Sequence, residues 1–351
     1  MGYRAGVVGA AGFAGIELVR LLSRHPEFDL AAATSDALAG TPIAKAYPAF
    51  TGVTDLAFST HEDTDFSAFD VVFLAVPHKA AMGMAPDLMA AGVTVVDLSA
   101  DFRLKDPAIY EKWYAPHTAT DLLAQAAFGL PELTGDELAA AAERRAAGEA
   151  VLVGCAGCYP TATSLAAAPA IRAGLVDAAA PVVADAVSGV TGAGKKATER
   201  THYCFANENL EAYGVGTHRH TPEIEQNIAY ITGKDLMKPE TWQYINFQPH
   251  LLPQVRGIEV TIYATCDRDF TNEEVYELYK DFYKDEPFVK VFPASLPVQT
   301  KWVYGTNFCE MTPTFDARTH RLIVSSVIDN IGKGAAGQAI QNMNLIMGLP
   351  E

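Results

Sequence analysis

Three glycines stand between a short apolar segment and an amphipathic one at the start of the chain. The segment GAAGFAG places Gly9, Gly12 and Gly15 after the apolar run 3–8 and before residues 16–25, in which leucines recur at helical spacing. Glycines permit a sharp turn and let a pyrophosphate approach the positive end of a helix. The pattern therefore predicts a strand, a turn and a helix that bind a dinucleotide; a tight turn without a ligand is the alternative.

Further apolar runs alternate with helical segments after this opening. They lie at 29–35, 70–77, 93–99 and 151–155. Near-continuous apolar strands separated by helices are typical of a parallel sheet covered on both faces. After residue 158 the strands become longer with polar alternation, which predicts a mixed sheet with one buried face. The fold class is therefore an α/β Rossmann dinucleotide-binding domain followed by an α+β domain.

Length and charge narrow the class of protein. At 351 residues the chain is longer than one hydrophobic core usually supports, which favours two domains. The formal net charge is −16, whereas binding a nucleic-acid backbone requires clustered Lys and Arg, so we expect no nucleic-acid partner. No segment approaches the roughly 20 uninterrupted apolar residues of a membrane helix. We see no signal peptide, and five cysteines fit a reducing compartment, so the expected location is the cytoplasm, with no membrane partner.

The residue after the second predicted strand bears on the choice between NAD and NADP. Asp36 stands about 20 residues past the glycine turn, where a carboxylate accepts hydrogen bonds from a ribose 2′-hydroxyl and repels a 2′-phosphate. Taken alone, Asp36 favours NAD. If Asp36 points to solvent, Ser35 and Thr34 are the alternative ligands for a phosphate.

Two cysteines precede a predicted helix in the segment VLVGCAGCYPTATSLAAA. Pro160 suits the first turn of that helix, which puts Cys158 at or just before the N-cap. A helix N-terminus lowers the pKa of a thiol and its amides stabilise an oxyanion, so Cys158 is the candidate nucleophile. Cys155 is expected to be buried. A redox C-x-x-C pair is the alternative, disfavoured by its place after about 150 residues of α/β pattern, and a regulatory Cys155–Cys158 disulfide is a further hypothesis.

A glycine-rich segment, GVTGAGKK, nearly matches a phosphate-binding P-loop. It has Lys196 where a P-loop needs Ser or Thr for Mg²⁺, which disfavours an ATPase. We expect this loop to lie beside phosphates or a nicotinamide.

Histidines and a glutamate gather in GTHRHTPEIEQ. We interpret His220 as a general acid/base that Glu223 orients. The segment lacks the further Cys or His ligands of a zinc site, so no metal is expected. A helix capped by Thr221, with Pro222 in its first turn, is compatible with the same role.

Segments from nearly the whole chain match one family. They are GAAGFAG, LAVPH, DLSADFRL, FGLPEL, GCYPTA, SGVTGAGKK, HRHTPEIEQ, PHLLPQVRGI, TKWVYGTNFCEM and DNIGKGAAGQAIQNMNLIMG. In these segments the chain resembles the N-acetyl-γ-glutamyl-phosphate reductases of arginine biosynthesis, relatives of aspartate-semialdehyde dehydrogenase. DLSADFRL and HRHTPEIEQ are the most specific of them.

The resemblance implies an NADP-dependent acyl-phosphate reductase that converts N-acetyl-γ-glutamyl phosphate to N-acetylglutamate 5-semialdehyde and releases phosphate. Cys158 would form a thioester that accepts hydride from NADPH. His220 would be the acid/base group, with Glu223 in support. Arg103 would contact phosphate, a surface ion pair being its alternative, and Asn330 would lie near the nicotinamide.

The other expected site residues lie in the same segments, except Ser35, which follows the second predicted strand. Those for the substrate, besides Arg103, are Ser99, His218, Arg219 and Lys195. Those for the cofactor, besides Asn330, are Gly9, Gly12, Phe13, Ala14, Gly15, Ser35, Pro77, Ser188 and Gly189.

The resemblance also implies the domains and the assembly. Residues 1–157 plus 330–351 would form the NADP-binding Rossmann domain, and 158–329 the catalytic and oligomerisation domain. A homodimer or homotetramer is expected.

Two features depart from the family's pattern. The family usually has Asn-Pro-Gly-Cys before the tyrosine, whereas this chain has Cys155-Ala156-Gly157-Cys158. Many members carry Arg where this chain has Asp36. The resemblance implies NADP(H) as the cofactor, whereas Asp36 leaves NAD(H) open.

Three alternative functions follow from the same residues. An aspartyl-phosphate enzyme has a different context around its histidine than HRHTPE. A carrier-bound aminoadipyl phosphate would favour a basic docking patch, against the net charge of −16. A non-catalytic dinucleotide sensor would have no need of Cys158, His220 and Arg103 together.

Overall fold

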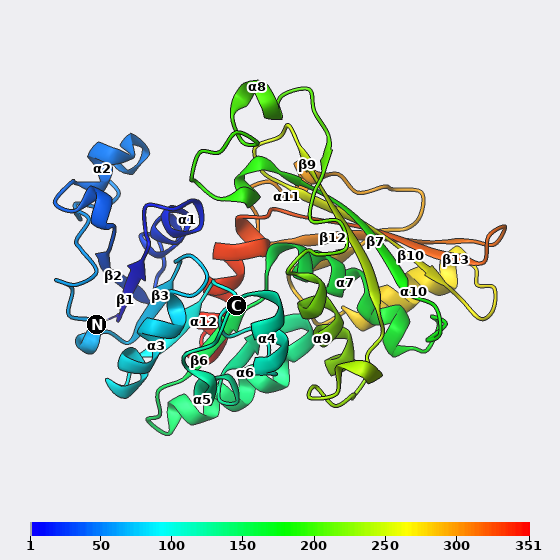
Figure 1. Cartoon of the computed structure of the whole chain (residues 1–351), viewed down its shortest axis with the longest axis horizontal. Coiled ribbons are helices and arrows are strands. Elements are labelled where there is room, and N and C mark those ends of the chain that lie inside the picture. The colour runs from blue at the N-terminus through cyan, green and yellow to red at the C-terminus, as the bar shows by residue number, and fades with distance from the viewer. Residues whose placement is uncertain (1) are drawn as a thin grey trace. The chain divides into compact units, whose positions relative to one another are not determined.

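The computed structural model describes residues 2–351, which divide into two compact units (Figure 1). Unit 1 holds the residues up to Ala156 together with 335–351, and unit 2 holds 157–334. The boundaries fall at 157 and 335, against the expected 158 and 330. Asn330 is bonded within unit 2, where its Oδ1 accepts the Gly257 N–H at 2.7 Å.

Unit 1 is built on a six-stranded parallel sheet in the order β2-β1-β3-β4-β6-β5. The strands are β1 (Tyr3–Val8), β2 (Phe28–Ala33), β3 (Val71–Leu74), β4 (Thr94–Asp97), β5 (Ala127–Gly129) and β6 (Leu152–Cys155). The inner strands β3, β4 and β6 are buried along their whole length, which explains their near-continuous apolar sequences. The strand order reverses between β1 and β3, and α/β sheets bind ligands at such a switch point.

The helices of unit 1 are α1 (Phe13–Leu22), α2 (Ile43–Ala46), α3 (Ala81–Ala90), α4 (Pro107–Trp113), α5 (Thr120–Leu123), α6 (Pro131–Ala146) and α12 (Gly337–Ile346). Of these, α1, α3, α6 and α12 contact strands of the sheet, which confirms the Rossmann class. The C-terminal helix α12, red in Figure 1, contacts α1, α6 and strands β4 to β6. Its Ala339 and Met343 share one apolar core with Leu18 of α1 and Phe73 of β3. The end of the chain thus completes the N-terminal unit.

Unit 2 contains a seven-stranded sheet in the order β11-β12-β13-β10-β7-β9-β8. The strands are β7 (Val182–Gly189), β8 (Glu211–Ala212), β9 (Ile245–Leu252), β10 (Ile258–Thr265), β11 (Val289–Val291), β12 (Cys309–Asp316) and β13 (Arg321–Ile328). The pairs β7/β9 and β11/β12 are parallel and the others antiparallel, so the predicted mixed sheet is confirmed. Every second residue of β10 from Ile258 to Ala264 is buried, as a sheet with one covered face requires.

The main helix of unit 2 is α7 (Cys158–Arg172), which contacts β10, β13, α9 (Thr221–Ile231) and α10 (Asn272–Phe282). All residues of α7 from Tyr159 to Ala170 are buried, and most of them are small. This composition lets α7 lie deep between the sheet and the other helices. The remaining helices are α8 (Tyr203–Ala206) and α11 (Thr300–Val303).

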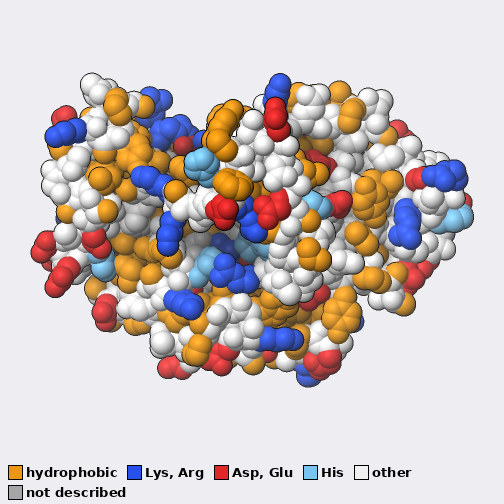
Figure 2. Space-filling model, turned by 45° about the horizontal axis from the view of Figure 1, so that its top comes forward, with side chains coloured by type: hydrophobic (Ala, Val, Ile, Leu, Met, Phe, Trp, Pro, Cys, Tyr) orange, Lys and Arg blue, Asp and Glu red, His pale blue; other side chains and the backbone are white. Residues whose placement is uncertain are grey.

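Two features of the structure bear on the expected partners, namely the distribution of surface charge and the lengths of the helices. On the face drawn in Figure 2, Lys and Arg side chains are interspersed with Asp, Glu and apolar ones. Between residues 2 and 351, no helix combines the length and the apolar character needed to cross a membrane.

Candidate active site

The glycine turn of unit 1 has the shape that a dinucleotide pyrophosphate requires. Gly9 adopts φ +78°, and a Cβ there would lie 2.4 Å from the Ala75 carbonyl oxygen at the end of β3. A Cβ on Gly15 would lie 2.3 Å from the Gly9 oxygen. Gly12 is the N-cap of α1 and has no side-chain cap, so the first amides of the helix face a space that no capping side chain fills. Backbone amides at a helix start are suited to bind phosphate oxygens, so the residues present fit the cofactor.

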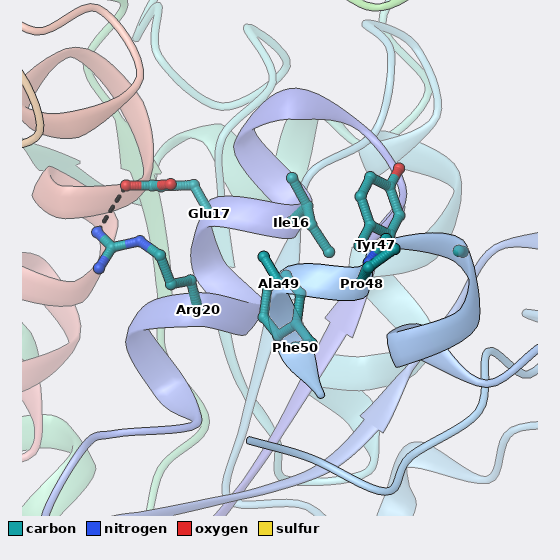
Figure 3. A pocket seen from close by; sticks show the side chains of 8 residues that line it. Ile16, Glu17, Arg20, Tyr47, Pro48, Ala49 and Phe50 are labelled. Atoms are coloured by element: carbon teal, nitrogen blue, oxygen red, sulfur yellow. Dashed lines mark hydrogen bonds and ion pairs between the residues drawn. The ribbon is translucent and has the colours of Figure 1, made fainter. Parts of the chain in front are cut away.

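A pocket of about 330 Å³ lies beside this turn in unit 1 (Figure 3). Its lining comes from Ile16, Glu17 and Arg20 of α1 and from residues 46–50, and Glu17 and Arg20 form an ion pair at 2.7 Å. Tyr47 donates its hydroxyl proton to the Ala11 oxygen at 2.7 Å. None of the lining residues is a predicted site residue, but Tyr47 ties residues 46–50 to the glycine turn.

Asp36 is exposed and follows β2, where the sequence predicts a ribose contact. Its Oδ1 accepts the His61 backbone N–H at 3.0 Å. One carboxylate oxygen therefore has a partner within unit 1. Ser35 beside it is half-buried, whereas Thr34 is only 1% exposed.

The segment DLSADFRL is buried in unit 1. Arg103 is 6% exposed, so it does not lie at the surface, and its Nη2 donates to the Leu98 carbonyl at 2.8 Å. Ser99 donates its hydroxyl proton to Asp97 at 2.8 Å. Burial, together with the nearby charge of Asp101, raises the pKa of Asp97 to about 7, and the Arg103 charge opposes that rise. The predicted phosphate contact of Arg103 stays a prediction.

Cys158 is the first residue of α7 in unit 2, one position after the N-cap where the sequence placed it at the latest, and it is half-buried. Gly157 is the N-cap, with φ −69° and ψ 160°. Gly334 packs directly on the cysteine: a Cβ at this position would lie 2.7 Å from the Cys158 Cβ. Gly334 belongs to a π-helical turn (Gly332–Ala336), in which its N–H donates to the Asp329 oxygen at 3.0 Å. Such turns are frequent at functional sites.

Glu223 connects the start of α9 to the start of α7. It is 1% exposed, and its Oε1 accepts the Gly157 N–H at 2.7 Å. The hydrogen bond joins a buried carboxylate to the residue that precedes Cys158. The carboxylate therefore fixes the loop that carries the thiol, and its predicted role of orienting His220 stays a prediction.

His220 is the N-cap of α9, with Pro222 in the first turn, which confirms the predicted helix with the cap one residue earlier than Thr221. Its N–H donates to Nδ1 of His218 at 3.1 Å. The His220 ring lies 6.1 Å from the ring of Tyr159, the residue after Cys158. The start of α7, which contains Cys158, therefore lies near the start of α9, which His220 caps.

His218 lies inside a cluster of aromatic rings. Its ring is within 6 Å of the rings of Tyr159, Tyr213, His220 and Phe247. Burial, followed by the charge of Arg219, lowers the pKa of His218 to about 4, so the ring is neutral at pH 7. His218 therefore supports the backbone of His220. The sequence did not predict this contact, and the expected contact of His218 with the substrate stays a prediction.

The other predicted residues of unit 2 lie in two places. Ser188, Gly189 and Asn330 are close to one another: Asn330 Nδ2 donates to Thr191 at 3.0 Å, and a Cβ on Gly192 would lie 2.9 Å from Ser188 Oγ. Asn330 uses both ends of its amide on the protein, so it holds the turn at 189–192. Lys195 and Arg219 are exposed.

The state of the cysteines bears on the redox alternative. All five carry thiols, and none is in a disulfide. Cys155 is 1% exposed, and burial raises the pKa of its thiol to about 12. A thiol that stays protonated at neutral pH is a poor partner for redox exchange, which disfavours the C-x-x-C alternative.

Sequence reasoning missed the tyrosines around Cys158. Tyr213 donates to the hydroxyl of Tyr159 at 3.2 Å, and burial raises the pKa of both phenols, that of Tyr213 to about 12. They stay neutral at pH 7. Among residues 2–351, no three His, Cys, Asp or Glu side chains are grouped as metal ligands.

Two family models match the chain in the same order as its two units. "Semialdehyde dehydrogenase, NAD binding domain" matches residues 4–141, and "Semialdehyde dehydrogenase, dimerisation domain" matches 158–330. The chain belongs to the semialdehyde dehydrogenase family. This family member is an oxidoreductase, and its Rossmann domain is of the kind that binds a nicotinamide dinucleotide.

Similar proteins place this family member near one group of reductases. N-acetyl-γ-glutamyl-phosphate reductase from Symbiobacterium thermophilum is 45% identical, and the match covers 100% of this chain and 97% of the relative. The reductase of the same name from Desulforudis audaxviator is 46% identical over 99% of this chain and 96% of its own length. The resemblance seen in the sequence motifs is thereby confirmed.

Solved structures support the fold. Aspartate semialdehyde dehydrogenase from Candida albicans, with NADP, has a TM-score of 0.74 at 17% identity and covers 99% of this chain and 98% of its own. Aspartate semialdehyde dehydrogenase II from Vibrio cholerae, complexed with ASA, has a TM-score of 0.73 at 16% identity and covers 99% of both chains. At such identities the similarity shows a shared fold alone.

Proposed function

We propose that the chain reduces N-acetyl-γ-glutamyl phosphate to N-acetylglutamate 5-semialdehyde with NADPH, a step of arginine biosynthesis. The observation that carries the proposal is Cys158 at the N-terminus of the 15-residue helix α7, with its preceding residue bonded to Glu223. The positive end of a helix favours a thiolate at this position. The full-length reductase relatives support the choice of substrate.

In the first step, the Cys158 thiolate attacks the γ-carbonyl carbon of the acyl phosphate. A carbon–sulfur bond forms, the carbon–oxygen bond to phosphate breaks, and inorganic phosphate leaves with that electron pair. The product is a thioester on Cys158, which is a better hydride acceptor than a carboxylate. His220 accepts the thiol proton before the attack.

When bound, NADPH supplies the hydride that reduces the thioester carbon. Hydride transfer leaves a negative charge on the former carbonyl oxygen, which the protein stabilises. The N-terminal end of α7 stabilises the oxyanion of the thiohemiacetal. The oxyanion then re-forms the carbonyl as the carbon–sulfur bond breaks, so the aldehyde leaves and the electron pair of that bond stays on the Cys158 sulfur. His220 returns its proton to this sulfur and restores the thiol.

We propose NADP(H) rather than NAD(H) as the cofactor. The bond from the His61 N–H to Asp36 supports this choice, because that carboxylate already has a partner on the protein. Comparison of NADPH and NADH in the same assay tests the preference. A clear preference for NADH would assign Asp36 to the ribose hydroxyls instead.

The assembly is proposed from the second unit. The match of residues 158–330 to a dimerisation domain supports an oligomer, and we propose a homodimer located in the cytoplasm. Light scattering at two protein concentrations would distinguish a dimer from a monomer or a tetramer.

The test of the function is phosphate-dependent reduction of NADP with N-acetylglutamate semialdehyde. The wild type should be active, and Cys158→Ser should lose activity by about 10³-fold or more, because the acyl intermediate cannot form at a useful rate. Cys204→Ser is the matched control, since Cys204 is also in unit 2 but is exposed on α8. Activity with aspartate semialdehyde alone would overturn the substrate, and full activity of Cys158→Ser would overturn the mechanism.

A further inference from the structure

A strained residue lies at the carboxyl edge of the unit 1 sheet. Lys79 has φ +78°, a left-handed conformation that residues other than glycine rarely adopt. It belongs to the loop 75–80 between β3 and α3. The loop leaves β3 beside the glycine turn, since a Cβ on Gly9 would touch the Ala75 carbonyl oxygen. β1 and β3 are adjacent strands at the switch point, so this loop and the glycine turn border the same edge of unit 1 (Figure 1).

A fully buried carboxylate holds this loop. Asp101 is 0% exposed, its Oδ1 accepts the Lys79 N–H at 2.8 Å, and its Oδ2 accepts the Met82 N–H at 3.1 Å. Tyr110, also 0% exposed, donates its hydroxyl proton to Oδ1 at 2.7 Å. Hydrogen bonds to a charged acceptor are stronger than neutral ones, so the carboxylate fixes the two ends of a four-residue stretch.

Contacts from the same segment hold the residue before Lys79. The Ala100 N–H donates to His78 Nδ1 at 3.1 Å. The His78 ring packs edge-on against Tyr114, which stacks on Tyr110 at 4.9 Å. Residues of the segment DLSADFRL and of α4 thus hold the loop in place. Those that contact it, Asp101, Ala100 and Tyr114, take no part in the proposed reaction steps.

Strain of this kind persists only where surrounding contacts enforce it, and it clusters at functional sites. A buried charge is also costly unless it is hydrogen-bonded, and here the bonds go to loop amides and a tyrosine. We propose that Asp101 and Tyr110 are positioning residues that hold the loop 75–80, with Lys79 in the left-handed conformation, in the shape that receives the nicotinamide dinucleotide. The inference rests on the proposed function, because it assumes that unit 1 binds this cofactor.

Cofactor binding without turnover tests the inference. Titration of the complete protein with NADPH, followed by fluorescence, should give roughly tenfold weaker binding for Asp101→Asn, which loses one charged acceptor. Tyr110→Phe should weaken binding less, because both loop amides keep their acceptors. Glu137→Gln is the matched control: this carboxylate of unit 1 also accepts a backbone N–H, from Phe128 at 2.9 Å, but it lies on α6.

A rescue variant separates positioning from general stability. Glycine adopts positive φ without strain, so Lys79→Gly should restore a several-fold part of the NADPH affinity lost in Asp101→Asn. Lys79→Gly alone should bind NADPH about as well as the wild type. Hydrogen exchange at the amides of residues 79 and 82, measured without cofactor, should quicken in Asp101→Asn and report the loop directly.

The outcomes are distinguishable. If the wild type binds neither NADPH nor NADH, the proposed function fails. If the wild type binds NADPH and both Asp101→Asn and Tyr110→Phe bind it equally well, the inference is wrong and the proposed function stands. If the double variant Lys79→Gly/Asp101→Asn folds but binds NADPH as weakly as Asp101→Asn alone, the inference is wrong, because the carboxylate then does not act through the conformation of Lys79. Should Asp101→Asn not fold, Tyr110→Phe with and without Lys79→Gly decides the question.

Discussion

The carboxylate of Glu223 accepts the backbone N–H of Gly157 at 2.7 Å. This bond ties the residue ahead of Cys158 to α9, the helix that His220 caps. Two segments whose bonded residues are 66 positions apart in sequence therefore hold the proposed nucleophile and the proposed acid/base residue in one local arrangement. The buried carboxylate thus fixes the loop that precedes Cys158 in this chain.

Replacing Glu223 should test that arrangement. Glu223→Ala leaves the Gly157 amide without its charged acceptor, and we expect kcat to fall by about 10- to 100-fold, with about 1–3 kcal/mol lost from the free energy of unfolding. Glu223→Gln keeps a neutral acceptor and should lose less. Glu225→Gln is the control on the same helix, since Glu225 accepts the Ile245 N–H at 3.1 Å. Wild-type kcat in Glu223→Ala would show that the bond has no part in catalysis.

Gly334→Ala should displace the nucleophile. The added Cβ would lie 2.7 Å from the Cys158 Cβ, so the helix start or the π-helical turn has to shift. We expect alkylation of Cys158 by iodoacetamide and turnover to change together, with turnover at least about tenfold lower, since small misplacements of reacting groups have large effects. Gly135→Ala is the control, because a Cβ there has open space and alanine favours a helix. Unchanged turnover in Gly334→Ala would mean that the turn yields freely.

Asp97 should make stability depend on pH. Its pKa in the folded protein is about 7 against an ordinary 3.8, so the folded state binds more protons than the unfolded state between these values. The contribution of Asp97 to stability therefore falls as pH rises from about 4 to about 7. Asp97→Asn removes this dependence, and its melting temperature relative to the wild type should be higher at about pH 8 than at about pH 5. The same difference at both pH values would contradict a raised pKa.

Cys155→Ala should leave the chemistry intact. The thiol is buried, has a pKa of about 12 and contacts Asn342 Nδ2 at 3.4 Å, so it is protonated during turnover. We expect kcat close to the wild type and a modest loss of stability of about 1 kcal/mol or less from the smaller side chain. Mild peroxide followed by assay with and without reductant tests the disulfide hypothesis. Activity that reductant restores in the wild type but not in Cys155→Ala would support a regulatory disulfide and contradict this account.

Local signals in the sequence were enough to predict some parts of the molecule. The glycine turn, the start of α7 at Cys158 and the start of α9 each depend on residues within one or two helical turns. The mixed sheet followed from the alternation in β10, where Ile258, Val260 and Ile262 are buried. Period and caps determine such features without knowledge of distant contacts.

Partners distant in the chain were not predictable. The bonds of the Asn330 amide to Gly257 and Thr191 had no signal in the sequence, and its expected place near the nicotinamide stays a prediction. The bond between Glu223 and Gly157, and that between Asp101 and Lys79, join segments whose approach depends on the finished fold. A buried carboxylate has no sequence signature that distinguishes it from an exposed one.

The most direct test of the central claim is mass spectrometry of the enzyme incubated with N-acetylglutamate semialdehyde and NADP in the absence of phosphate. The reaction then stops at the thioester, so the account predicts an N-acetylglutamyl adduct on the peptide that contains Cys158, formed with an equal amount of NADPH. Added phosphate should release the adduct, and Cys158→Ser should form neither adduct nor NADPH. An adduct on another residue, or a burst of NADPH that Cys158→Ser retains, would contradict the assignment of Cys158 as the nucleophile.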